Sequence, residues 1–186
     1  MATTTHNTKT DADLVAELRR RNPHAMADLY DRYGRIAYAL ILRIVRDTGI
    51  AEDLVQETFL RVWNRVPFFD PDRGSFGPWL LTIAHNRAID HVRSVRTRQN
   101  TVAFDEADHP SLATDPKAFD NARRVRAAMR RLLPNHLRVI ELAYFEGLSQ
   151  LEVAERLGQP LGTVKSWVRM ALHSLREELV PAATMS

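Results

Sequence analysis

Residues 148–172, LSQLEVAERLGQPLGTVKSWVRMAL, contain two helical patterns separated by a short turn. Ser149 is a favourable N-cap residue, and Glu152 stands three positions later, where a capping box requires a side-chain acceptor. Gly158 follows the end of the first pattern, as a C-terminal glycine commonly does. The stretch therefore predicts a helix-turn-helix, an arrangement in which the second helix enters the major groove of DNA.

The second of these helices has an apolar face and a polar face. Val164, Val168 and Leu175 recur at helical spacing and predict the buried side. The opposite side suits DNA, because arginine can bond guanine edges, a hydroxyl can bond a base or a phosphate, and a thioether can touch a thymine methyl. The alternative is a face that contacts only water. The predicted DNA contacts are Thr163, Lys165, Ser166, Arg169, Met170 and His173.

The rest of the chain is also helical in pattern, and sustained alternation of β-branched residues is absent. Helices are predicted from Pro23 to about Arg46, Ile50 to Val66 and Ser75 to Arg98, and near 117–132, 134–145, 149–157 and 162–179. Residues 99–116 are polar, acidic and proline-containing, which is typical of a linker. We therefore predict an all-α protein of two small helical domains, in residues 1–98 and 117–186, joined by a flexible linker at 99–116.

Composition excludes several classes of protein. The 186 residues include no cysteine, so disulfides and cysteine-ligated metal sites are impossible. The N-terminus lacks a signal-peptide pattern, and no apolar run approaches the roughly 20 residues of a membrane span. We therefore expect a cytoplasmic protein that does not insert into membranes.

The net charge is only +3, but arginines cluster in residues 87–98 and 117–138, which favours a polyanionic partner.

The helix predicted for residues 50–66 carries a mixed stripe outside its apolar face. The apolar face consists of Ile50, Leu54, Val55, Phe59, Val62 and Val66. The stripe combines carboxylates, amides, an arginine and one leucine, as a helix-docking surface does. A solvated face with one exposed leucine is an equally good interpretation. The candidate docking residues are Asp53, Gln56, Glu57, Leu60, Arg61 and Asn64.

The helix predicted for residues 75–98 should bury Leu80, Ala84, Ala88 and Val95, which leaves Ile83 among the outward residues. An aromatic, an amide and an arginine on the outward face, preceded by FFDPDRGSF at 68–76, indicate a single-strand binding surface. The loop could also supply a pocket for an extruded base. The competing interpretation packs the aromatic rings between helices. The candidate residues are Phe69, Arg73, Phe76, Trp79, Asn86, Asp90 and Arg93.

These motifs, in this order, resemble an extracytoplasmic-function (ECF) sigma factor of the sigma-70 family over roughly residues 11–180. AEDLVQETFLRVW is similar to the family's polymerase-docking helix, FGPWLLTIAHNRAIDHVR to its −10 reading helix, and the segment from Leu133 to Leu172 to its −35 reading domain. The resemblance implies that the docking stripe contacts the coiled coil of the polymerase β′ subunit. It also implies that Asn86 lies near a flipped base of the non-template strand.

The resemblance further implies the partners of the protein. These are the RNA polymerase core, through its β′ and β subunits, promoter DNA, and an anti-sigma factor that could hold the protein at the membrane. Asp105, Glu106 and Asp108 would mimic nucleic-acid charge as the linker threads the polymerase channels. Many members have basic residues where Trp167 and Met170 stand, so the promoter sequence does not follow from this chain. Trp167 is expected to pack rather than to contact a base.

Two other classes of function compete with this interpretation. The first is a helix-turn-helix regulator that acts without docking on polymerase. The second is an enzyme, which the sequence disfavours because Glu52 and Asp53 are adjacent and the histidines lack ligand spacing with a carboxylate. We therefore expect no catalytic residue, no metal and no cofactor.

Overall fold

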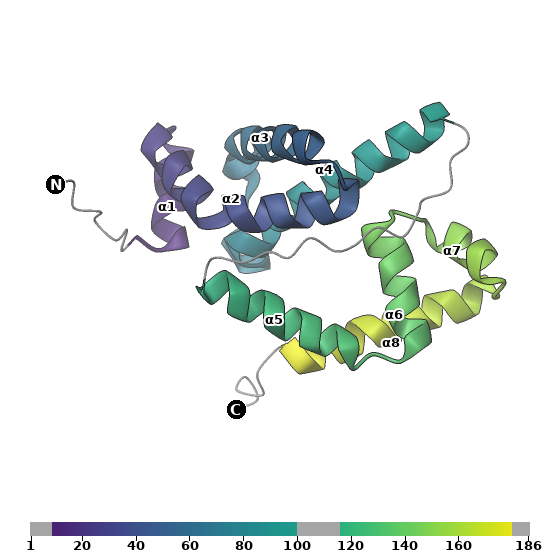
Figure 1. The fold of residues 1–186 in the computed structure, drawn as a ribbon. Helices are drawn as coiled ribbons and strands as arrows, with labels where there is room; N and C mark the ends of the chain where they lie inside the picture. Colours follow the sequence, from purple (N-terminus) through teal and green to yellow (C-terminus); the bar gives the residue numbers. More distant parts are fainter. Residues whose placement is uncertain (1–8, 100–115, 180–186) are drawn as a thin grey trace. The chain divides into compact units, whose positions relative to one another are not determined.

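The computed structural model describes residues 9–99 and 116–179 of the chain. Within these two ranges all regular structure is helical, and the chain divides into two compact units (Figure 1). The predicted all-α class with two helical domains is therefore confirmed. Most of the predicted linker, including Asp105, Glu106 and Asp108, lies outside the described residues. Gln99 ends one helix, and Pro116 begins the next.

The N-terminal unit is built on three helices that all pack on one another. These are α2 (Pro23–Val45), α3 (Thr48–Arg65) and α4 (Phe76–Gln99), and α1 (Asp11–Arg19) packs on α2. Two short 3₁₀ turns, η1 (Val66–Phe68) and η2 (Pro71–Arg73), connect α3 to α4. The side chains that lose all contact with solvent include Leu14, Leu18, Leu29, Ile41, Val62 and Leu80, and Val66 of η1 joins them.

Side-chain caps explain where the first helices begin. The side chain of Asn22 accepts a hydrogen bond from the His24 amide at 3.1 Å, and Pro23 occupies the first turn of α2, as predicted. The Asp47 side chain accepts from the Ile50 amide at 2.9 Å. Asp47 is therefore the cap of α3, which begins at Thr48 rather than at the predicted Ile50.

Helix α1 was not predicted, although its start carries a recognisable signal. The Thr10 hydroxyl accepts from the Asp13 amide at 3.2 Å, and the Asp13 carboxylate accepts from the Thr10 amide at 2.9 Å. This is a capping box with aspartate at the third position. The hydrogen bonds from Thr10 also lower the pKa of the Asp13 carboxyl below its ordinary value.

The buried arc of α4 is wider than predicted. Ile83, which was placed on the outward face, is only 7% exposed, so that placement is wrong. Ile89 and Val92 are buried as well, whereas Val95 is only half-buried. The reason is that α4 contacts both α2 and α3, so it needs apolar side chains toward two neighbours instead of one.

The C-terminal unit is organised around its last helix. Its elements are α5 (Pro116–Arg130), α6 (Pro134–Ile140), a π-helical turn η3 (Glu141–Phe145), α7 (Gln150–Leu157) and α8 (Leu161–Leu179). Helix α8 packs on α5, α6 and α7. Val164 and Ala171 of α8 are fully buried, and Trp167 and Val168 pack at the edge of the same core, as expected for Trp167.

The predicted helix-turn-helix is present as α7, a glycine turn and α8. The Ser149 hydroxyl accepts from the Glu152 amide at 3.3 Å, and the Glu152 carboxylate accepts from the Ser149 amide at 2.7 Å. Gly158 ends α7 with a φ of 60°, a left-handed conformation that glycine adopts without strain. The predicted helix-turn-helix is confirmed, and so are the two predicted ends of its first helix, the capping box of Ser149 with Glu152 and the C-terminal Gly158.

Replacing Ser149 by alanine should destabilise the C-terminal unit by about 1 kcal/mol, because the Glu152 amide loses its acceptor. Ser149→Asn is the matched control, since it keeps an acceptor and should cost only a few tenths of a kcal/mol. Amide hydrogen exchange along α8 measures the free energy of opening of this unit. An unchanged exchange rate in Ser149→Ala would show that the cap does not stabilise the helix-turn-helix.

Candidate nucleic-acid and protein interfaces

The predicted docking stripe lies on one side of α3. The opposite side is buried through Leu54, Val55 and Phe59, which are at most 5% exposed. On the outer side Leu60 is 64% exposed, so an apolar side chain stands in the middle of a polar stripe. Arg61 is half-buried, and the remaining members of the stripe are exposed: Asp53, Gln56, Glu57 and Asn64.

Arg87 of α4 connects this stripe to the outward face of its own helix. Its guanidinium donates to the Glu57 carboxylate on α3, and its Nη1 lies 3.9 Å from Asp90 Oδ2 on α4. The Arg87 side chain is only 20% exposed, and its Nε is buried without a hydrogen-bond partner in the described part of the chain. The sequence predicted Arg87 only as part of a basic cluster. The structure shows that it joins the docking stripe to the outward face of α4.

The outward face of α4 is a narrow strip. Asn86, Asp90 and Arg93 are exposed, as predicted, and Trp79 at its start is half-buried. Since the strip stands opposite the wide buried arc, its residues are available to a ligand without disturbing the core.

Two of the predicted aromatic residues are buried. Phe69 is 7% and Phe76 is 3% exposed, so neither presents an open ring for stacking, and that expectation is wrong. Their ring centroids lie 5.6 Å apart at an interplanar angle of 89°, and Trp79 lies 5.1 Å from Phe69 and 5.5 Å from Phe76. The competing interpretation, that these rings pack between helices, describes them correctly.

Phe68 of η1 is 85% exposed, so its ring faces solvent. The sequence run FFDPDRGS contained this signal, but only one of two adjacent aromatics can point inward from a short turn, and the run does not say which. Arg73 of η2 is exposed, as predicted.

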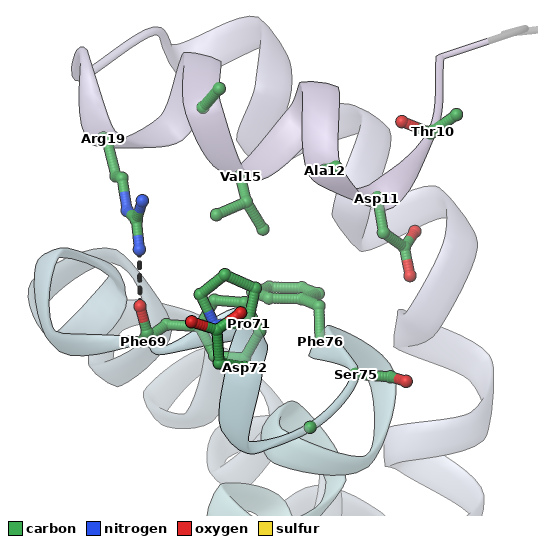
Figure 2. Close-up of a pocket in the computed structure, with 12 residues that line it drawn as sticks. Thr10, Asp11, Ala12, Val15, Arg19, Phe69, Pro71, Asp72, Ser75 and Phe76 are labelled. Atoms are coloured by element: carbon green, nitrogen blue, oxygen red, sulfur yellow. Dashed lines mark hydrogen bonds between the residues drawn. The ribbon is translucent and has the colours of Figure 1, made fainter.

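A pocket of about 550 Å³ lies between α1 and the loop of residues 69–76 (Figure 2). Phe69, Phe76 and Val15 supply apolar lining, whereas Asp11, Asp72 and Ser75 supply oxygen atoms. Its size falls in the range of small-molecule sites. The possibility of a pocket at this loop was predicted, but the contribution of α1 was not.

Polar contacts hold α1 beside this pocket. Asp11 accepts hydrogen bonds from the Tyr33 hydroxyl and from Arg32, both of α2. Burial and the hydrogen bond to Asp11 raise the pKa of the Tyr33 hydroxyl well above its ordinary value, so it stays protonated and donates at physiological pH. At the other end of α1, Arg19 donates to the backbone carbonyl of Phe69 (Figure 2).

The predicted DNA-binding face of α8 is arranged as expected from the helical wheel. Lys165, Arg169 and His173 are exposed, and Met170 is 49% exposed. Thr163 and Ser166 are half-buried. The Ser166 hydroxyl lies 4.0 Å from the Met170 sulfur, and His173 Nε2 lies 3.8 Å from Glu177 Oε1. The structure thus places these side chains on one side of one helix.

The described residues offer neither a membrane-spanning helix nor a metal site. No helix of residues 9–99 or 116–179 is long and apolar enough to cross a membrane. The same residues contain no group of three or more histidine, aspartate or glutamate side chains that could hold a metal ion.

The chain matches two protein-family models, Sigma-70 region 2 over residues 29–98 and Sigma-70, region 4 over residues 128–177. The ECF RNA polymerase sigma factor SigK of Mycobacterium bovis (strain BCG / Pasteur 1173P2) is 41% identical over 173 residues, which cover 89% of this chain and 92% of the relative. SigK of Mycolicibacterium vanbaalenii is 37% identical over 169 residues, covering 88% and 86%.

Among solved structures, Rhodobacter sphaeroides SigE in complex with the anti-sigma ChrR is 28% identical, with a TM-score of 0.47 and coverage of 89% of this chain and 96% of that one. The region 2 match spans most of α2, all of α3 and all but the last residue of α4, and the region 4 match covers the helix-turn-helix up to residue 177, two residues before α8 ends. The two family matches and the 41% identity to SigK over 89% of this chain show the family. The chain belongs to the ECF sigma factors of the sigma-70 family and is an RNA polymerase sigma factor.

Proposed function

We propose that three separate faces of this sigma factor divide the work of initiation. The α3 stripe docks on the β′ subunit of core polymerase, α4 and the loop before it bind the single-stranded −10 element, and α8 reads the −35 element. The observation that supports this division is that α3, α4 and α8 each bury one side in a core and expose most of their predicted residues on the other. A regulator that acts without polymerase docking is not favoured, because the region 2 match covers the docking helix.

The α3 stripe has the composition of a protein interface. Leu60 is an exposed apolar side chain, and charged and amide groups surround it. Interfaces commonly place an apolar anchor at the centre of a polar rim, because the rim excludes water from the anchor. The carboxylates of Asp53 and Glu57 suit a partner surface that carries basic side chains.

The −10 surface offers one site for a base and separate groups for the backbone. The pocket beside Phe69 and Phe76 combines apolar walls with carboxylate and hydroxyl oxygens, which suits the edge of an unstacked base. Phe68 is exposed enough to stack on a neighbouring base. Arg73 and Arg93 are exposed and suit phosphates, while Asn86 has the donor and acceptor needed to read a base.

Binding at these surfaces supports promoter opening without a chemical step by the sigma factor itself. Holding unpaired bases offsets the free energy of unpairing and unstacking, which is a few kcal/mol per extruded base. We also propose that the protein works in the cytoplasm and that an anti-sigma factor restrains it; membership of the ECF family supports this. Co-purification from the native cell with either core polymerase or an anti-sigma factor would test both partners.

The docking proposal predicts that Asp53→Ala combined with Leu60→Ala lowers affinity for core polymerase by at least about tenfold, because truncating a central anchor such as Leu60 typically costs about 2 kcal/mol or more. The melting temperature should hardly change, since surface substitutions usually cost within about 0.5 kcal/mol. Glu57 is left intact, because its removal would deprive the poorly hydrated Arg87 of its partner.

Glu52→Ala is the matched control, because it removes an exposed carboxylate from the same helix outside the stripe. Fluorescence anisotropy of the labelled full chain titrated with core polymerase measures the affinity. If the double variant binds core as tightly as the wild-type protein, α3 does not dock through this stripe.

The −35 proposal predicts that Arg169→Ala loses about 1–3 kcal/mol of preference for one base pair, because a bidentate contact to guanine is worth that much. Arg176→Ala is the control, since Arg176 lies on the same side of α8 about 10 Å farther along the axis. Binding of the holoenzyme to promoter duplexes substituted at each −35 position measures the preference. A uniform loss across all sequences would make Arg169 a phosphate contact and not a base reader.

A further inference from the structure

Helix α1 lies N-terminal to the residues matched by the region 2 model, which begins at residue 29. It nevertheless contributes fully buried side chains, Leu14 and Leu18, to the core of the N-terminal unit. It also forms one wall of the 550 Å³ pocket (Figure 2). Its C-terminal end makes polar contacts with the opposite wall directly, and its N-terminal end reaches that wall through Tyr33 of α2.

At the C-terminal end of α1, one arginine holds two carbonyl groups of the loop. Arg19 Nη2 donates to the Phe69 carbonyl oxygen (Figure 2), and Arg19 Nε lies 3.4 Å from the Val66 carbonyl oxygen. The Val66 carbonyl begins η1 and also accepts from the Phe69 amide at 3.2 Å, whereas the Phe69 carbonyl follows the turn. A guanidinium can serve both at once because its donors are fixed in one plane, whereas a lysine ammonium is a single point charge.

At the N-terminal end of α1, the contacts run through a tyrosine. Asp11 accepts from the Tyr33 hydroxyl, and the Tyr33 ring lies 6.0 Å from the Phe76 ring in an edge-on arrangement. Tyr33 also lies against Gly77 so closely that a Cβ there would come within 2.9 Å of its ring. Both phenylalanine walls of the pocket are thus fixed through α1, Phe69 by Arg19 and Phe76 by Tyr33 with Asp11.

We propose that α1 is the element that sets the geometry of the pocket and that Arg19 is a positioning residue for base selection at the −10 element. The inference rests on the proposed function, in which the pocket receives an unstacked base. Selection is a difference between the affinities for two bases, so it depends on how closely the walls fit the correct one. Releasing the Phe69 carbonyl would let that wall move and would lower the difference more than the affinity itself.

The test compares Arg19→Ala and Arg19→Lys with the wild-type chain, each in complex with core polymerase. Arg20→Ala is the matched control, because Arg20 is the adjacent exposed arginine and its side chain makes no hydrogen bond to the described residues. Each holoenzyme is titrated with single-stranded −10 oligonucleotides that carry each of the four bases at each position. The quantity measured is the ratio of the dissociation constants for the worst and the best base.

Arg19→Ala should lower this ratio by roughly fivefold or more at one position, as expected from the loss of a charged hydrogen bond. Arg19→Lys should lower it nearly as much, because lysine keeps the charge but cannot bridge both carbonyls. Arg20→Ala should keep the ratio. Tyr33→Phe, which keeps the ring and loses the hydroxyl, should lower the ratio at the same position and decides the matter if Arg19→Ala fails to fold.

Three results would overturn the inference. Arg19→Ala could weaken binding of all oligonucleotides equally with the ratio intact, which would make Arg19 a phosphate contact. Arg19→Lys could keep the full ratio, which would mean that a positive charge is sufficient for base selection and that the bridge between the two carbonyls is not needed. Finally, a wild-type holoenzyme that shows no base preference at any −10 position would refute the proposed function of the loop, and the inference with it; that failure is visible before any variant is measured.

Discussion

The structure of the N-terminal unit depends on the burial of α4 against two neighbours at once. Because α4 contacts both α2 and α3, a wide arc of it is buried, and a narrow strip with Asn86, Asp90 and Arg93 faces out. Arg87 stands at the edge of that strip and pairs with Glu57 on α3. This packing therefore places the outward strip of α4, which we assign to DNA, beside the stripe of α3, which we assign to polymerase. The ion pair of Arg87 with Glu57 joins the two surfaces.

The features that the sequence predicted well were those with a local physical cause. Each of these features depends on residues a few positions apart in the chain. They are the capping box of Ser149 and Glu152, the cap and proline at the start of α2, and the apolar spacing of α8. The outward faces of α3 and α8 followed from the same spacing. Thr10 and Asp13 carry a comparable signal for helix α1. That helix was not predicted, because its nine residues contain only a short apolar pattern.

Features that depend on distant residues could not be predicted in the same way. Ile83 was misplaced because a helical wheel does not show how many neighbours a helix has. The run Phe68-Phe69 could not reveal which ring turns inward, since that depends on Phe76 and Trp79 across the loop. The contact of Arg19 with the Phe69 carbonyl spans 50 positions in the chain and has no local signature. Long-range contacts of this kind form the pocket.

In the proposed holoenzyme, core polymerase covers the outer side of α3, and Glu52 on the same helix stays open to solvent. Carbodiimide labelling of carboxylates in the free sigma factor and in the holoenzyme, read by mass spectrometry residue by residue, tests it most directly. The account predicts that Asp53 is protected in the holoenzyme and that Glu52, one residue away and outside the stripe, is labelled equally in both. Equal labelling of Asp53 with and without core polymerase would contradict it.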